Sequence, residues 1–224
     1  MNASTDDIGR RSFELVLTAL FTAIIVLMAY VPFLGYIPLV GINCTIIHIP
    51  VILGALFLGP KKGGFLGFIF GLTSFLNNTL RPATASAFVF SPVIAFGQFG
   101  AAGALKSTLI CFLPRILVGV VPFFVYLLVR KFAKKGVALA IAGFSGAFTN
   151  TLLVMGGIFI LYRDAYAIAL GKPAETLINV IMGIVALNGS MESVLAAFLV
   201  TVIGLALAKA THTVMKAESA AEGK

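Results

Sequence analysis

The sequence predicts an all-α integral membrane protein, a bundle of six transmembrane helices with long outer loops and both termini in the cytosol. Two observations carry this prediction. Hydrophobic residues make up 60% of the 224 residues and charged residues only 11%, with a mean hydropathy of +1.08, whereas a soluble domain carries about 25% charged residues. Lys and Arg also gather in clusters at alternate ends of the apolar runs, and cytosolic loops concentrate these two residues.

Six apolar runs separate the basic clusters, and each is expected to form one helix. The runs are residues 13–31, 46–58, 64–75, 106–129, 137–162 and 191–208. The first exceeds the apolar core of a signal peptide, so we expect a retained helix. Several others are shorter than the roughly 20 residues that cross a bilayer, and these should tilt or extend into their flanks.

The basic clusters assign the connections to the two faces of the membrane. Residues 59–63 and 131–136 form short cytosolic turns, and longer outer segments are predicted at 32–45, 77–105 and 163–190. Long loops of mixed composition usually carry function. An apolar stretch within the third segment is either an outer continuation of a helix or a re-entrant piece.

The chain is expected to form one transmembrane domain over residues 10–210. Small polar tails precede it at 1–9 and follow it at 211–224, and both are predicted to be mobile.

Several functional classes find no support in the sequence. The net charge of +8 suits contact with anionic lipid, and its basic residues lack the interleaved aromatics of a nucleic-acid groove, so no nucleic-acid partner is expected. Cys44 and Cys111 lack the spacing of a metal site, and no metal is predicted. No catalytic or ATP-binding motif is present, so we predict neither an enzyme nor a cofactor, and transport would need an ion gradient or an ATPase partner.

Polar residues recur at one depth along the predicted helices. At 1.5 Å per residue, the most polar residue of five helices lies about 20 to 25 Å above the cytosolic charge of its helix. These residues are His48, Asn77, Arg115, Asn150 and Glu192. Each could meet lipid headgroups at a helix end, or all could face one cavity, because polar groups within the bilayer usually face a cavity or a partner helix.

Arg115 fits the headgroup interpretation least, because long apolar segments flank it. A cationic side chain there costs roughly 3 kcal/mol unless it is paired. Either Glu192 neutralises it, or it holds the negative group of a ligand. Since Arg binds a carboxylate through two parallel hydrogen bonds, an anionic organic substrate is the sharper hypothesis.

The outer segment after the third run combines hydroxyl, amide and aromatic groups, as a lid over a partly apolar small molecule would. Interfacial anchoring of its Phe residues is the alternative, and Arg81 could anchor the loop instead of touching ligand. The predicted substrate-binding residues are His48, Asn77, Asn78, Arg81, Ser86, Phe90, Arg115, Asn150, Asn188 and Glu192.

The first run carries Ala19 and Ala23 one turn apart. Small residues at this spacing let a second helix approach closely in lipid. The partner helix could belong to another protein or to this chain.

These features resemble the S components, the substrate-binding membrane subunits of energy-coupling factor (ECF) vitamin transporters. The resemblance covers most of the chain and is weakest over 163–190. It rests on the six predicted spans, the two alanines and three strings: IIHIPVILGALFLGPKKGGFLGFIFGLTSF, FVFSP and CFLPRILVGVVPFFVY.

The resemblance implies a binder that captures a water-soluble vitamin at the outer face of a bacterial or archaeal cell membrane. Ala19 and Ala23 match the family's contact with a coupling transmembrane subunit, which two cytosolic ATPase subunits drive. The second to fourth runs look most like the pantothenate-specific branch. Riboflavin, pyridoxine, hydroxymethylpyrimidine and folate remain alternatives, as do an autonomous ion-coupled secondary transporter and a membrane scaffold without a small-molecule site.

Overall fold

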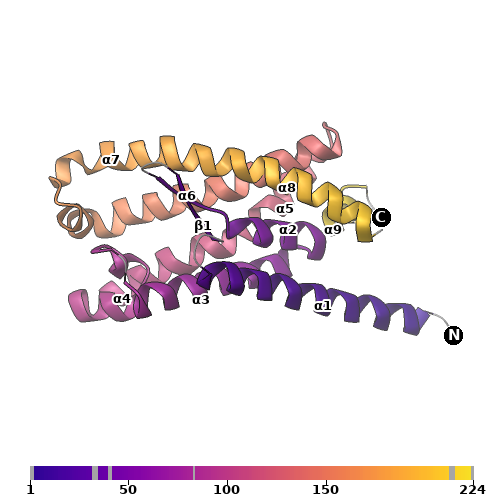
Figure 1. Cartoon of the computed structure of the whole chain (residues 1–224), viewed down its shortest axis with the longest axis horizontal. Coiled ribbons are helices and arrows are strands. Elements are labelled where there is room, and N and C mark those ends of the chain that lie inside the picture. The colour runs from indigo at the N-terminus through magenta and orange to yellow at the C-terminus, as the bar shows by residue number, and fades with distance from the viewer. Residues whose placement is uncertain (1–2, 32–34, 40–41, 83, 212–214, 223–224) are drawn as a thin grey trace.

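The computed structural model describes residues 3–31, 35–39, 42–82, 84–211 and 215–222, and these are almost wholly helical (Figure 1). The predicted helical class is therefore confirmed, with one short hairpin added. The elements are α1 (Ala3–Tyr30), β1 (Tyr36–Leu39), β2 (Ile42–Thr45), α2 (His48–Leu58), α3 (Pro60–Leu80), the 3-10 turn η1 (Ala87–Val89), α4 (Pro92–Val118), α5 (Val121–Arg130), α6 (Lys135–Ala169), the 3-10 turn η2 (Ala174–Thr176), α7 (Leu177–Ile184), the π-helical turn η3 (Val185–Gly189), α8 (Ser190–Thr211) and α9 (Lys216–Ala221).

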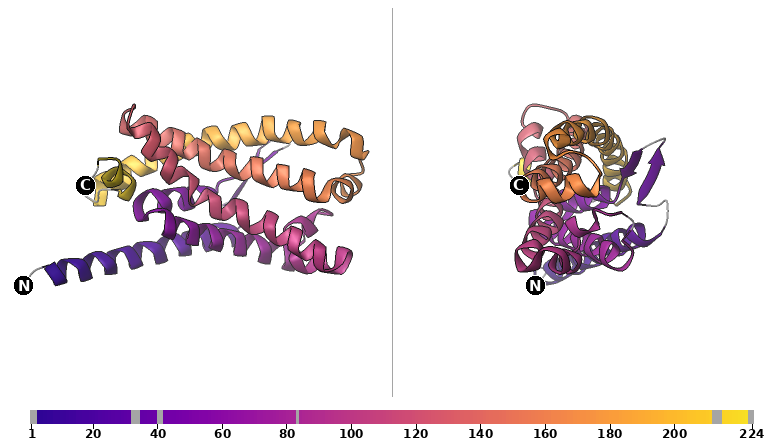
Figure 2. Two further views of the ribbon diagram at one scale, coloured as in Figure 1. Left: turned by 180° about the vertical axis from the view of Figure 1, so that it is seen from behind. Right: turned by 90° about the vertical axis from the view of Figure 1, so that its left-hand side faces the viewer.

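The long helices form two layers with α2 between them (Figure 1). One layer contains α1, α3 and α4, and the other contains α6, α7 and α8. Contacts between α4 and α6 join the layers. Both termini lie at the same end of the molecule, as the two views from opposite sides agree (Figure 2).

Among the described residues, four helical stretches are long and apolar enough to cross a membrane: Arg11–Tyr30, Pro92–Arg130, Lys135–Ala169 and Ala174–Ala210. All six predicted runs lie on helices, but α2 has only 11 residues and is about 16 Å long. All of its residues are buried, as expected for a helix that is apolar all round. The fourth run is broken into α4 and α5 at Gly119.

The outer connections are shorter than predicted. The predicted bounds of the loop at 77–105 are wrong, because α3 continues to Leu80 and α4 begins at Pro92. Residues 163–190 are mostly helical as well, and α7 continues through η3 into α8. The apolar stretch there is thus an outer continuation of a helix. In the first connection, β1 and β2 pair antiparallel, from Tyr36 opposite Thr45 to Leu39 opposite Ile42.

The predicted tails differ in structure. Helix α1 already begins at Ala3, within the predicted tail 1–9, of which residues 1–2 lie outside the described residues. In the predicted tail 211–224, residues 216–221 form α9, whose Ala217 and Glu218 are buried. Residues 212–214 and 223–224 of that tail also lie outside the described part of the chain.

Glycines bring α3 and α4 into backbone contact. A Cβ atom on Gly63 would lie 2.1 Å from the carbonyl oxygen of Gly119, and one on Gly67 would lie 2.2 Å from that of Arg115. Any side chain at either position would push the two helices apart. The close approach therefore sets where Arg115 sits relative to α3.

We expect Gly67→Ala to destabilise the fold, because the added methyl overlaps the Arg115 carbonyl and overpacking costs about 1–3 kcal/mol. Gly64→Ala is the matched control, since its Cβ would meet Val120 at an ordinary 3.4 Å. Thermal unfolding of both purified variants measures the difference. Equal midpoints for the two variants would contradict the contact.

Candidate functional site

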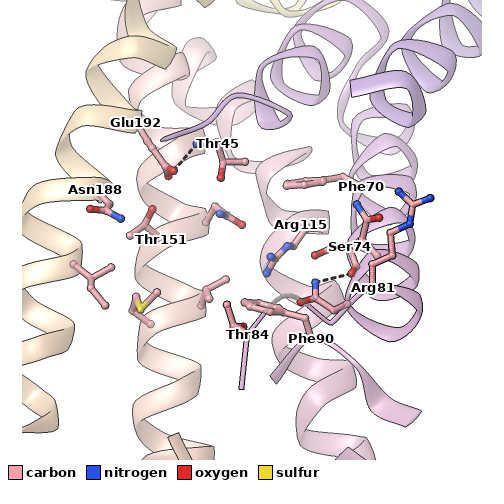
Figure 3. A pocket seen from close by; sticks show the side chains of 16 residues that line it. Thr45, Phe70, Ser74, Arg81, Thr84, Phe90, Arg115, Thr151, Asn188 and Glu192 are labelled. Carbon is pink, nitrogen blue, oxygen red and sulfur yellow. Dashed lines mark hydrogen bonds between the residues drawn. The ribbon is translucent and has the colours of Figure 1, made fainter. Parts of the chain in front are cut away.

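A cavity of about 490 Å³ lies between the two layers, bordered by α3 and α4 on one side and by α6 and α8 on the other (Figure 3). Eight of the ten predicted site residues line it. They are Asn77, Asn78, Arg81, Phe90, Arg115, Asn150, Asn188 and Glu192. Four of the five residues predicted at one depth therefore gather around one volume.

The residue before Arg115, Pro114, helps to hold Arg115 in the cavity wall. Pro114 lies inside α4 and has no N–H, so the carbonyl of Ile110 lacks its helical donor. The Nη1 atom of Arg115 donates to this carbonyl at 3.1 Å. The proline thus creates an acceptor that orients the guanidinium group beside it.

Two aromatic rings flank the same guanidinium. Its central carbon lies 5.5 Å from the ring centre of Phe70 on α3 and 4.8 Å from that of Phe90, within the range of cation–π attraction. The side chain is only 6% exposed. A buried cation flanked by apolar rings is stabilised further by a negatively charged group nearby.

The connection that carries Phe90 is tied down on both sides. The hydroxyls of Thr79 and Ser91 hydrogen-bond at 2.7 Å, and Ser91 also caps α4 by accepting from the amide of Ile94. Ser107 donates to the carbonyl of Val89 at 3.1 Å. These bonds fix the ring of Phe90 over Arg115.

Glu192 lies on the opposite side of the cavity from Arg115, on α8 (Figure 3). Its carboxylate accepts a 2.8 Å hydrogen bond from the backbone amide of Thr45. This bond joins the end of β2 to α8. Glu192 therefore contributes negative charge to the cavity and also anchors the hairpin beside it.

The amide side chains supply donors and acceptors. Asn77 donates to the carbonyl of Ala29 on α1, and Asn78 donates to that of Ser74, each at 2.8 Å. The Oδ1 atom of Asn150 is buried and has no hydrogen-bond partner among the described residues. Asn188 lies in the π-helical turn η3, a geometry frequent at functional sites. A polar ligand could satisfy the Asn150 oxygen.

Two predicted residues lie outside the cavity. His48 is the first residue of α2 and is 1% exposed, and neither ring nitrogen has a hydrogen-bond partner within the described residues. Ser86 contacts the hydroxyl of Thr84 at 3.2 Å, and it is Thr84 that lines the cavity. His48 has the same predicted depth as the cavity residues, but it does not line the cavity. It lies instead in α2, which is buried on all sides.

Eight lining residues were not predicted: Thr45, Phe70, Ser74, Thr84, Thr151, Val154, Met155 and Ile184. Helical spacing could have found some of them. Phe70 and Ser74 precede Asn78 by two turns and one turn on α3, and Val154 follows Asn150 by one turn on α6.

Ala19 and Ala23 lie elsewhere, on the surface of α1. Both are exposed, and they line an apolar groove of about 660 Å³. The other lining residues are Leu15, Thr18, Thr22, Val26, Leu27 and Phe65. Within the described part of the chain, no helix covers these alanines, so the groove is open to another molecule.

Comparison with known proteins agrees with this architecture. Residues 13–204 match the family described as "ECF transporter, substrate-specific component". The chain belongs to this family. It is 34% identical over 207 residues to the pantothenic acid transporter PanT of Lactococcus lactis subsp. cremoris, covering 90% of this chain and 97% of the relative. It is 31% identical over 202 residues to the pantothenate transporter PanT of Leuconostoc mesenteroides, covering 85% and 89%.

Family membership and the apolar helices together identify a multi-pass protein of the bacterial plasma membrane. Its family is one of transporter components, consistent with the absence of a catalytic motif in the sequence.

We expect Glu192→Ala to loosen the hairpin of this S component, because the Thr45 amide loses a charged acceptor worth about 1.5–3 kcal/mol. Hydrogen exchange over residues 42–47 should accelerate by about tenfold or more. Glu175→Ala, at an exposed glutamate of η2, is the control. Unchanged exchange in the Glu192 variant would show that the bond does not hold the hairpin.

Proposed function

We propose that this S component captures pantothenate from outside the cell and delivers it inward through an ATP-driven coupling module. The observation that carries this proposal is a buried arginine, Arg115, in the wall of a cavity that is also lined by amide, hydroxyl and apolar groups. The names of the two relatives support pantothenate as the vitamin.

The chemistry of the cavity suits each part of pantothenate. Arg115 would hold the carboxylate, and the amide side chains would bond the ligand's own amide and hydroxyls. Val154, Met155 and Ile184 give an apolar wall for its geminal methyl groups. The volume of about 490 Å³ lies within the usual range of ligand pockets, about 300–1,000 Å³.

Other vitamins fit this arrangement less well. Riboflavin, pyridoxine and hydroxymethylpyrimidine have no carboxylate, and each would leave the Arg115 charge without an anionic partner from the ligand. Folate is anionic but bulky. An ion-coupled secondary transporter would not need the apolar groove on α1 for its transport cycle.

The proposed topology has six membrane crossings, with α2 as a short buried crossing and the cavity toward the outside. Its support is the gathering of basic clusters at the end that holds both termini. Lys62 and Lys216 share one carboxylate there, and Lys135 and Arg130 share another. The positive-inside rule then places this end in the cytosol.

The groove at Ala19 and Ala23 is the proposed docking surface for the coupling transmembrane subunit, whose two ATPases hydrolyse ATP. Its support is the exposure of both alanines and the apolar lining. Small residues permit the close helix approach that drives association in lipid. This chain would need no cofactor of its own.

A vitamin panel tests the proposed ligand. Pantothenate should raise the unfolding temperature of the purified protein, because a ligand that binds only the folded state stabilises it, whereas the other B vitamins should not. Arg115→Met should reduce this shift, and Arg163→Met, at an exposed arginine of α6, should retain it. A shift with another vitamin alone would refute the assignment.

Larger side chains in the docking groove should impair transport without changing pantothenate binding. We expect Ala19→Leu with Ala23→Leu to leave pantothenate affinity unchanged and to reduce uptake into vesicles that contain the coupling module. Ala206→Leu with Ala210→Leu is the control, since these exposed alanines of α8 share the same spacing. Normal uptake by the α1 variant would move the docking surface elsewhere.

A further inference from the structure

Helix α9 is part of the packed core at the end of the molecule that holds both termini. Met215 and Ala217 are fully buried in the same apolar cluster as α2, and α9 contacts α2 and α5. The aliphatic part of Lys216 lies near Gly59, where α2 ends. The apolar residues therefore fix α9 in place and leave its charged side chains at defined positions.

Two glutamates use both carboxylate oxygens to join helices at this end. On α1, Glu14 forms ion pairs with Lys62 of α3 and Lys216 of α9. The lysine Nζ atoms lie 2.5 Å and 2.7 Å from separate carboxylate oxygens of Glu14. On α9, Glu218 pairs with Lys135 of α6 and, at 3.9 Å, with Arg130 of α5. Through α9, these pairs connect α1 to the opposite layer.

Glu14 is also adjacent to the docking groove. Leu15 and Thr18 line that groove, and the hydroxyl of Thr18 donates to the carbonyl of Glu14 at 2.6 Å. In this part of α1 the apolar residues Leu15 and Val16 are largely exposed, whereas Leu17 packs into the core. The ion pairs of Glu14 thus act together with the core contact of Leu17 to fix the position of this segment of α1.

We propose that α9 is a positioning element for partner docking, and that Lys216, through Glu14, sets the position of the groove half of α1. The inference rests on the proposed docking function of the groove. The ligand cavity lies at the other end of α3 and does not include these residues. Loss of the pair should therefore weaken docking and leave ligand binding unchanged.

The test measures three quantities on the full chain: pantothenate affinity, affinity for the purified coupling module, and vesicle uptake. Lys216→Met should weaken module affinity by about two- to fivefold, the range expected for a partly exposed ion pair. Glu14→Gln should do the same, and the double variant should show less than the sum of the two effects. Lys216→Arg should restore affinity, because it keeps the charge.

Lys209→Met is the matched control, at an exposed lysine of α8. Module affinity of Lys216→Met equal to that of this control would overturn the inference. So would a parallel loss of pantothenate binding, which would indicate a general structural role. If wild-type protein fails to bind pantothenate, or if bulk at Ala19 and Ala23 leaves module affinity intact, the proposed function itself is wrong, and the inference falls with it.

Discussion

The buried guanidinium of Arg115 is the interaction on which the rest of this structure depends. A cation inside an apolar bundle is costly, and here it is stabilised by the carbonyl that Pro114 leaves open and by the rings of Phe70 and Phe90. These contacts lie on the flanks of the guanidinium group, and Arg115 lines the cavity. We propose that a negatively charged group of the ligand faces Arg115 there.

The helix packing serves this arrangement. Glycine contacts bring the backbone of α3 against that of Arg115, so Phe70, Ser74 and Asn78 on α3 reach the same cavity. From the other layer, Asn150 and Glu192 complete the wall. The groove lies on the exposed surface of α1, away from these residues, so the proposed ligand site and the proposed docking surface are separate parts of one bundle.

Much of the cavity could be predicted from the sequence, because the rise of an α-helix converts residue spacing into depth. Asn77, Arg115, Asn150 and Glu192 were found in this way. Depth does not specify the direction in which a side chain points, and this is why His48 shares the predicted depth but does not line the cavity. In the connection between α3 and α4, the hydroxyl at the cavity is that of Thr84 and not that of Ser86, a difference set by loop conformation.

Tertiary contacts account for the other differences. The residues of α9 have the small, polar composition of a mobile tail, yet Met215 anchors them in the core and Glu218 pairs across two helices. Spacing along the chain cannot reveal such pairs. The outer loops were predicted to be too long for a related reason. Polar and glycine-rich residues have a low helix propensity, but packing against neighbouring elements can override this propensity and extend a helix.

The most direct measurement compares pantothenate with panthenol, in which a hydroxymethyl group replaces the carboxylate, on wild-type protein and on Arg115→Met. Wild type should prefer pantothenate by about tenfold or more, since a hydrogen bond to a charged group contributes about 1.5–3 kcal/mol. The variant should bind the two compounds with nearly equal affinity. A variant that keeps the wild-type preference would contradict the role of Arg115 as the carboxylate partner.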